Sequence, residues 1–341
     1  MNAYMKCLRN KVRSLPLLYV LGAVLLLGSA VLGLVLGSTS IAPGELMELL
    51  WDDARNDAAA RIVRYVRLPR TLAALLCGAA LSVAGAVIQG VLANRLASPS
   101  VIGVNAGAGL AVTLCGAFGL LAGWQISLFA FLGAFVAVMA VSFGAKLWGA
   151  SRSTVILMGV AMNSLLGAIS DTVITFEPTV GMMSNEFRVG DFSAVTYARL
   201  IPATIGILVA LLLLLTLSNE LDVLTLGDER ARSLGLNTGV WRVIFLALSA
   251  MLAGAAVSLV GLLSFVGLLV PHAIRRMAGT KSVHLLLLCA LYGAGFVALC
   301  DTLSRVIFAP YELPVGILMA FLGAPFFLYI LIRGKGGHRR A

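Results

Sequence analysis

Residues that commonly do chemistry are scattered in this sequence and form no cluster. His272 follows Pro271 in an apolar stretch, and no second metal ligand stands at a usable spacing. We favour a structural hydrogen bond for His272, beside a helix end or kink shaped by Pro271. The cysteines include no Cys-x-x-Cys pair, and most lie in or near apolar runs, which favours packing: Cys7, Cys77, Cys115, Cys289 and Cys300. We therefore predict neither a catalytic residue nor a metal site.

The chain also lacks the loop that binds the phosphates of ATP. No Gly-x-x-x-x-Gly-Lys-[Ser/Thr] pattern occurs, and Gly334-Lys335-Gly336 lacks the strand and helix that such a loop needs around it. We expect this chain to bind no cofactor of its own. If ATP drives its work, ATP and magnesium are bound by another subunit.

Four polar residues sit within or at the edges of apolar runs: Gln89, Asn105, Asn163 and Asp171. Polar groups are costly in lipid and usually face a bundle interior or a water-filled cavity. One interpretation is hydrogen bonding between helices. The other is that these residues line a translocation pathway.

A short polar block, Leu226-Gly-Asp-Glu-Arg-Ala-Arg-Ser-Leu-Gly-Leu-Asn237, interrupts the apolar second half of the chain. Gly227 and Gly235 bracket a segment that can form a short helix, since glycine permits sharp turns at helix ends. A short helix lying across the membrane surface can seat in a groove on a soluble partner. The alternative is an ordinary cytosolic loop.

A purely basic stretch, Arg61-Ile-Val-Arg-Tyr-Val-Arg67-Leu-Pro-Arg70, precedes one apolar run, and Arg305 ends another. These arginines can snorkel to the membrane interface, or they can form a docking surface for an acidic partner outside the cell. For Arg305 a third interpretation exists. Asp301 stands four residues earlier, the spacing of an ion pair on one helix.

Composition sets the class of protein. Of the 341 residues 60% are hydrophobic and 12% are charged, about half the charged share of a soluble domain. Apolar runs of about 20 residues, the length of a membrane-spanning helix, recur along the chain. We predict an all-α polytopic membrane protein, one domain over residues 1–341, with spans near 16–36, 71–92, 101–121, 125–148, 153–176, 197–218, 240–262, 265–278, 283–305 and 314–332. The eighth is short enough to be tilted, re-entrant or fused with the seventh.

Lysine and arginine in the connections predict the orientation. With the N-terminus in the cytoplasm, most of the 25 Lys and Arg residues fall in cytoplasmic segments. About ten spans then place both termini in the cytoplasm. The predicted segments outside the bilayer are 15 N-terminal cytosolic residues, an external segment at about 38–70, a cytosolic region at about 219–239 and a cytosolic tail at 333–341. The net charge of +10 follows from this bias, and we predict no binding of nucleic acid, which needs a basic face.

Four blocks, in order from about residue 60 to residue 332, resemble the FecCD family. The first runs from Arg67-Leu-Pro-Arg through Gln89-Gly-Val-Leu-Ala-Asn to Pro99-Ser-Val-Ile-Gly-Val-Asn105, and the second is the polar block at 226–237. The third is Gly261-Leu-Leu-Ser-Phe-Val-Gly-Leu-Leu-Val-Pro-His272, and the fourth joins Asp301-Thr-Leu-Ser-Arg305, Glu312-Leu-Pro-Val-Gly and Gly323-Ala-Pro. One segment departs from the family pattern, because Glu186-Phe-Arg-Val-Gly190-Asp-Phe lacks the tryptophan and the Gly-Ser pair of many relatives.

The resemblance implies a permease of a type II ABC importer in the bacterial cell membrane. Such importers join two permease chains, identical or closely related, to two ATPase subunits and an extracytoplasmic substrate-binding protein. The polar block would couple to the ATPase through Gly227, Asp228, Glu229, Arg230, Ala231, Arg232, Leu234 and Gly235. Arginines at the positions of Arg67, Arg70 and Arg305 would face acidic residues of the binding protein.

The family implies import of an iron(III)-siderophore or a related iron chelate, with haem or cobalamin as the alternative cargo. A different class, an ion-coupled secondary transporter, would need carboxylates at the membrane midplane, and Asp171 is the one candidate well inside a predicted span. A membrane enzyme or a receptor would need a convergent cluster of His, Asp or Cys, and the sequence offers none.

Overall fold

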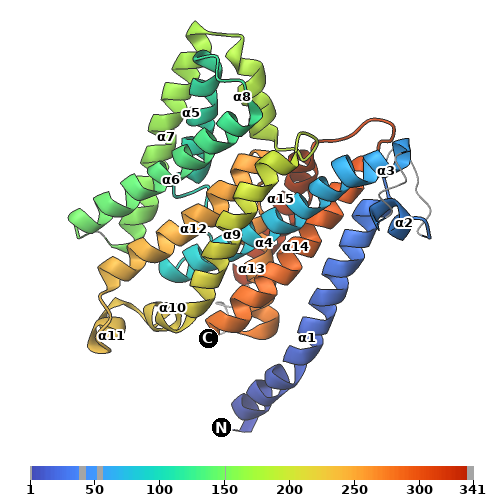
Figure 1. Ribbon diagram of the computed structural model, residues 1–341. Coiled ribbons are helices and arrows are strands. Elements are labelled where there is room, and N and C mark those ends of the chain that lie inside the picture. Colours follow the sequence, from blue (N-terminus) through green and yellow to red (C-terminus); the bar gives the residue numbers. More distant parts are fainter. Residues whose placement is uncertain (1, 38–43, 52–56, 150, 336–341) are drawn as a thin grey trace.

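The computed structural model describes residues 2–37, 44–51, 57–149 and 151–335, and in these residues all regular structure is helical (Figure 1). The first half contains α1 (Asn2–Val35), α2 (Leu46–Trp51), α3 (Ala58–Ile62), a π-helical turn (Val63–Arg67), α4 (Leu68–Val91), α5 (Val104–Ala117), α6 (Gly123–Leu147), α7 (Arg152–Phe176) and α8 (Val180–Val189). The second half contains α9 (Tyr197–Thr216), α10 (Ser218–Thr225), α11 (Asp228–Ser233), α12 (Thr238–Val260), α13 (Val266–Ala278), α14 (Ser282–Val306) and α15 (Val315–Lys335).

Among the described residues, seven helical stretches are long and apolar enough to cross a bilayer: Leu15–Val35, Ala58–Val91, Gly123–Leu147, Arg152–Phe176, Tyr197–Thr216, Thr238–Val260 and Ser282–Val306. Two shorter apolar helices, Val104–Ala117 and Val315–Leu328, and the short α13 account for the other predicted spans. The all-α prediction with about ten spans is confirmed. Helices are the expected solution, because a bilayer offers no water to pair an exposed backbone.

The segment predicted to be external, 38–70, is helical over much of its described length. Residues 38–43 and 52–56 of that segment, and 336–341 of the predicted tail, lie outside the described residues. From Ala58 the chain is continuously helical to Val91, so the basic stretch 61–70 forms the first part of the helix that contains the second span. The π-helical turn comes just before Pro69, with the Leu68 amide donating to the Val63 carbonyl. This wider turn lets the helix continue into a proline, which lacks an amide hydrogen and crowds the preceding turn.

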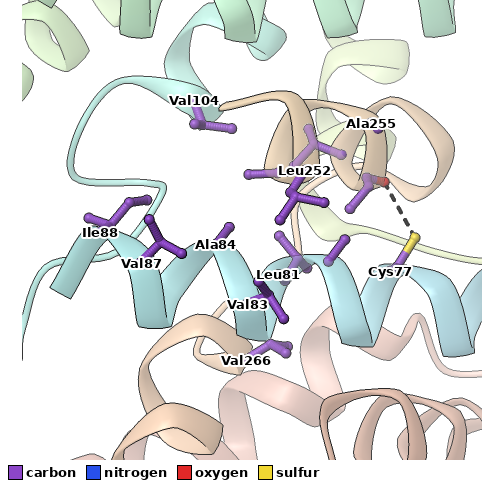
Figure 2. Close-up of a cluster of buried hydrophobic side chains, with 14 of the residues drawn as sticks. Cys77, Leu81, Val83, Ala84, Val87, Ile88, Val104, Leu252, Ala255 and Val266 are labelled. Carbon is purple, nitrogen blue, oxygen red and sulfur yellow. Dashed lines mark hydrogen bonds between the residues drawn. The ribbon is translucent and has the colours of Figure 1, made fainter. Parts of the chain in front are cut away.

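Two helices form the centre of the molecule. In α4, 83% of the apolar stretch is buried, and in α12 the figure is 78%, against 17% in α7. Figure 2 shows side chains of α4 packed against Val104 of α5, Leu252 of α12 and Val266 of α13. The Cys77 thiol lies in this cluster and donates to the Ala256 carbonyl at 3.6 Å. Four cysteines in the described part of the chain are free and buried, as a packing role predicts: Cys77, Cys115, Cys289 and Cys300.

Glycines on α4 allow its neighbours to approach at backbone distance. A Cβ atom at Gly78 would collide with the backbone carbonyl of Gly293 in α14, and one at Gly85 would collide with the backbone of Gly267 in α13. Small residues at helix crossings are the usual device for tight packing in membranes, where van der Waals contact takes the place of the hydrophobic effect. These contacts fix how α13 and α14 lie against α4.

Replacing Gly78 with alanine is expected to lower the free energy of unfolding by about 1–3 kcal/mol, the usual cost of overpacking. The colliding atoms belong to a backbone, which cannot rotate away. Gly206→Ala in α9 is the matched control, because a Cβ there meets nothing within 4 Å and alanine is the better helix former. Thermal unfolding in detergent measures both variants, and equal shifts of the midpoint would contradict this account of the α4–α14 crossing.

The two ends of the bundle differ. Figure 1 shows α10 and α11 at the end where both chain termini lie, and α2 and α3 at the opposite end. There Leu46 and Leu49 of α2 pack with Ala60 and Val63 in a small separate cluster. The polar block at 226–237 and the basic stretch at 61–70 therefore lie on opposite sides of the membrane-spanning region.

Candidate functional site

The polar block folds into the short helix that its glycines predict. Gly227 precedes α11 with a φ of 110°, and Gly235 follows it with a φ of 83°. Both values lie in the region that favours glycine, because other residues would crowd their own Cβ there. Asn237 then caps α12, its side-chain oxygen accepting from the Val240 amide at 3.3 Å. Two sharp turns and a cap hold α11 beside the start of α12.

Asp228 points inward and ties α11 to two other helices. Its carboxylate accepts from Arg152 at the start of α7 at 2.7 Å and from Arg242 in α12 at 2.8 Å. Burial acts to raise the pKa of Asp228, but the hydrogen bond from Arg152 and the charge of Arg242 outweigh it and lower the pKa below its ordinary value. Asp228 is thus ionised at neutral pH and serves as a clamp inside the chain. The contact with the ATPase predicted for Asp228 stays a prediction, and in the structure its two carboxylate oxygens bond to Arg152 and Arg242.

The other residues of the predicted coupling set divide between inside and outside. Ala231 is fully buried, whereas Glu229, Arg230, Arg232 and Leu234 are exposed, Leu234 with 66% of its surface. The outward face of α11 therefore offers one acid, two arginines and a large apolar side chain. The sequence interpretation missed Arg152 and Arg242, which hold this helix in place.

Two of the four polar residues in the spans hydrogen-bond to backbone carbonyls of other segments. Gln89 donates to the Gly267 carbonyl at 3.0 Å and accepts from Arg275. Asn163 donates to the Ser100 carbonyl at 2.8 Å. Ser100 lies in the non-helical segment 92–103, and Gly267 lies in the first turn of α13, where Pro271, four residues on, has no amide hydrogen to donate to it. Hydrogen bonding within the bundle is the role the structure gives to Gln89 and Asn163.

The other two polar residues are reachable from outside the packed core. Asn105 lines a cavity of about 190 Å³ between the segments 98–105 and 263–268, beside Ser98, Ser100 and Ser264. Asp171 is exposed and pairs with Arg188 of α8 at 3.3 Å. It lies five residues before Phe176, the last residue of α7. It therefore does not stand at the middle of a span, contrary to the sequence interpretation.

One face of α7 is both exposed and polar. Ser164, Asp171 and Thr175 follow one another at helical spacing, and all three are exposed. A charged side chain facing lipid is costly, so this face is better suited to another protein surface or to water. Helix α7 also has the smallest buried share, 17%, of the seven long spans.

The three arginines predicted to dock an outside partner are buried instead. Arg67, Arg70 and Arg305 each expose 4% of their surface. Arg70 pairs with Asp301 at 3.0 Å and with Glu312 at 2.7 Å, and Arg305 pairs with Asp301 at 3.1 Å. The predicted pair of Asp301 and Arg305 is confirmed. In this conformation internal carboxylates occupy Arg70 and Arg305, so the docking assignment does not fit the exposed surface.

The end of α1 depends on the same arginines. Arg67 donates to the carbonyls of Leu34 and Val35 at 2.8 Å, and Arg305 donates to the Gly33 carbonyl at 3.1 Å. The last carbonyls of a helix have no partner within it and carry partial negative charge. Two guanidinium groups, one from the π-helical turn before α4 and one from α14, thus cap α1 and join three helical segments at this end of the bundle.

The family model of the FecCD transport family matches residues 13–333. The chain belongs to the FecCD transport family. It is 36% identical to the hemin transport system permease protein HmuU of Yersinia pestis, over 94% of this chain and 96% of that protein. It is 35% identical to the vitamin B12 import system permease protein BtuC of Escherichia coli, over 91% and 93% of the two chains.

A solved structure agrees with this assignment. An ABC transporter described as metal-chelate type, in an inward-facing conformation, matches with a TM-score of 0.81 and 28% identity, over 93% of this chain and 99% of that one. The FecCD chain is therefore a multi-pass permease subunit of an ABC importer in the inner membrane, and it is not an enzyme. An importer of this class works with ATPase and substrate-binding partners and dimerises. The alternative of an ion-coupled secondary transporter is excluded.

Proposed function

We propose that this chain imports an iron(III)-siderophore or a related iron chelate. Two copies of the chain, or this chain and a close paralogue, would form the pathway. Two ATPase subunits would bind on the cytoplasmic side of the membrane, and a substrate-binding protein would bind on the extracytoplasmic side. Similarity to a metal-chelate-type transporter and to a hemin permease supports a chelate as cargo. Haem and cobalamin are the alternative cargoes, and each is itself a metal held in an organic ligand.

The clamp at Asp228 is the observation that carries the mechanism. In the proposal, ATP and magnesium bind the partner ATPase, and its closure moves α11. Asp228 bonds to Arg152 and Arg242, so movement of α11 would pull directly on the first turn of α7 and the second turn of α12. Helix α7 carries the exposed polar face, and α12 packs against the central α4. A displacement at the membrane surface thereby reaches both the proposed pathway and the core.

The pathway is proposed to follow the exposed polar face of α7 between two permease copies. Asp171 would lie at its wall, and the cavity beside Asn105 would open toward it, while Gln89 and Asn163 hydrogen-bond to backbone carbonyls nearby. A wall with few charges suits a bulky chelate, which must pass without being held tightly. Both termini are proposed to be cytoplasmic, since they share the end of the bundle that carries α11.

Reconstitution with the partner proteins tests the proposal. The permease, its ATPase and its binding protein are placed in proteoliposomes with ATP on the ATPase side. Uptake is then measured for a ferric siderophore, haem and cobalamin. ATP-dependent uptake of the siderophore that requires the binding protein supports the proposal. Uptake of haem or cobalamin alone would overturn the cargo, and an assembled complex that imports none of the three would overturn import of metal chelates.

A further inference from the structure

A basic cleft lies beside α11, next to the clamp at Asp228. Its volume is about 670 Å³. One wall comes from the end of α6 and the turn after it, with Lys146, Gly149 and Ser151, and the other comes from α11 and the start of α12, with Asp228, Arg232 and Arg242. The cleft therefore joins the first half of the chain to the coupling helix of the second half.

The charges of the cleft are unbalanced. Lys146, Arg232 and Arg242 line it together with a single acid, Asp228. That acid is already occupied, because one carboxylate oxygen accepts from Arg152 and the other from Arg242. Within the described part of the chain, neither Lys146 nor Arg232 takes part in an ion pair, and both are exposed. Arg232 is oriented by a hydrogen bond from its Nε to the Thr238 hydroxyl at 3.3 Å, which leaves its other donors available.

This arrangement favours a carboxylate that arrives from another protein. An arginine fork binds a carboxylate through two parallel hydrogen bonds, and a lysine adds a point charge. The cleft is far larger than one carboxylate, so it can admit a turn or helix end that carries the acid. Exposed apolar side chains of the adjoining elements, Leu234 at 66% and Trp148 at 78%, can cover the rest of such a segment. Basic walls suit a protein interface, in which charge sets orientation and specificity.

We propose that this cleft is the socket for an acidic side chain of the ATPase partner, bound between Lys146 and Arg232. The inference rests on the proposed function, in which α11 meets that ATPase. It adds that the turn after α6 is the second half of the contact. The ATPase would thus contact two segments of the permease, α11 and the turn after α6.

Binding of the ATPase to the full-length permease, held in nanodiscs of neutral lipid, tests the socket. The double variant Lys146→Glu with Arg232→Glu is expected to weaken the Kd at least tenfold. Added salt is expected to weaken the wild-type complex and to leave the variant complex little changed, because exposed charges are screened. Lys281→Glu, an exposed charge reversal at the start of α14, is the matched control and is expected to keep the wild-type Kd. The milder pair Lys146→Gln with Arg232→Gln, with an unchanged unfolding midpoint, separates lost binding from misfolding.

Charge reversal in the partner completes the experiment. Changing acidic residues of the ATPase one at a time to lysine is expected to reveal one that restores binding to the double variant. If the wild-type permease binds the ATPase and the folded double variant binds equally well, the socket is wrong and the proposed function stands. If the wild type does not bind the ATPase at all, the proposed function fails as well. A loss of binding that occurs only in anionic lipid would show that the cleft holds a lipid headgroup, and would also overturn the socket.

Discussion

Replacing Asp301 with asparagine is expected to lower the free energy of unfolding by about 3–5 kcal/mol, the usual loss when one partner of a buried ion pair is removed. Asp301 exposes 1% of its surface and lies between Arg70 and Arg305, at 3.0 and 3.1 Å. Asparagine keeps the shape and removes the charge. Arg305 then loses the carboxylate with which it pairs, and Arg70 keeps Glu312 at 2.7 Å and Asp191 at 3.9 Å, both of which are partly exposed. The unfolding midpoint in detergent and the yield of folded protein measure the loss.

The matched control is an exposed pair in the same chain. Asp171→Asn removes the carboxylate that pairs with Arg188, and these two side chains expose 69% and 49% of their surface. Exposed pairs contribute about 0–1 kcal/mol, so this variant is expected to unfold close to the wild-type midpoint. Equal losses for the two variants would mean that the buried network does not hold α1, α4 and α14 together.

The spans could be predicted because an apolar run of about 20 residues has one stable outcome in a membrane protein. Boundaries could not be predicted to the same degree. The helix of the second span begins as early as Ala58 because α2 supports its first turns. Leu49 of α2 packs with Val63, and the Leu49 carbonyl accepts a hydrogen bond from Arg64 at 2.8 Å. These partners are separated by a loop, and no local pattern in the sequence announces them.

The arginines show the same division between local and distant partners. The pair of Asp301 and Arg305 was predictable, because four residues is one helical turn. The bonds from Arg70 to Asp301 and Glu312 span more than 200 positions. A single sequence indicates that arginines end these helices, but it does not indicate whether their partners lie outside the protein or inside. In this conformation Arg70 and Arg305 are buried, and their partners lie inside the protein.

The polar block was predicted as a short helix, but its inward residue was not identified. One signal was available. Asp228 and Ala231 stand three positions apart and so share a face, and a small apolar residue between charged ones marks the face that packs. The structure places both on the inner side, with Glu229 outside. The cations that hold Asp228 lie 76 and 14 positions away and could be found only once the helices were assembled.

Replacing Asp228 with asparagine is expected to reduce cargo-dependent ATPase stimulation roughly 5- to 150-fold, the range of typical coupling energies of about 1–3 kcal/mol. Asparagine cannot neutralise Arg152 and Arg242 together, and α11 is released from α7 and α12. Membrane insertion and the basal ATPase rate of the partner are expected to stay unchanged, since no span contains Asp228. Cargo uptake in proteoliposomes and ATP hydrolysis with and without loaded binding protein measure the effect.

A double-mutant cycle distinguishes an Asp228 that transmits movement to α7 and α12 from an Asp228 that only contacts the ATPase. Arg152→Gln and Arg242→Gln should each reduce stimulation, and adding either one to Asp228→Asn should cost little more, because the interaction is already lost. Fully additive losses would mean that Asp228 acts on the ATPase by itself and does not act through α7 and α12. The pKa of Asp228 is lowered in the folded protein, so its contribution is complete above the ordinary pKa of an aspartate and is lost as the pH falls through the lowered value. Coupling through this carboxylate should therefore be constant between pH 6 and pH 8, and a titration of coupling within that window would point to a different group.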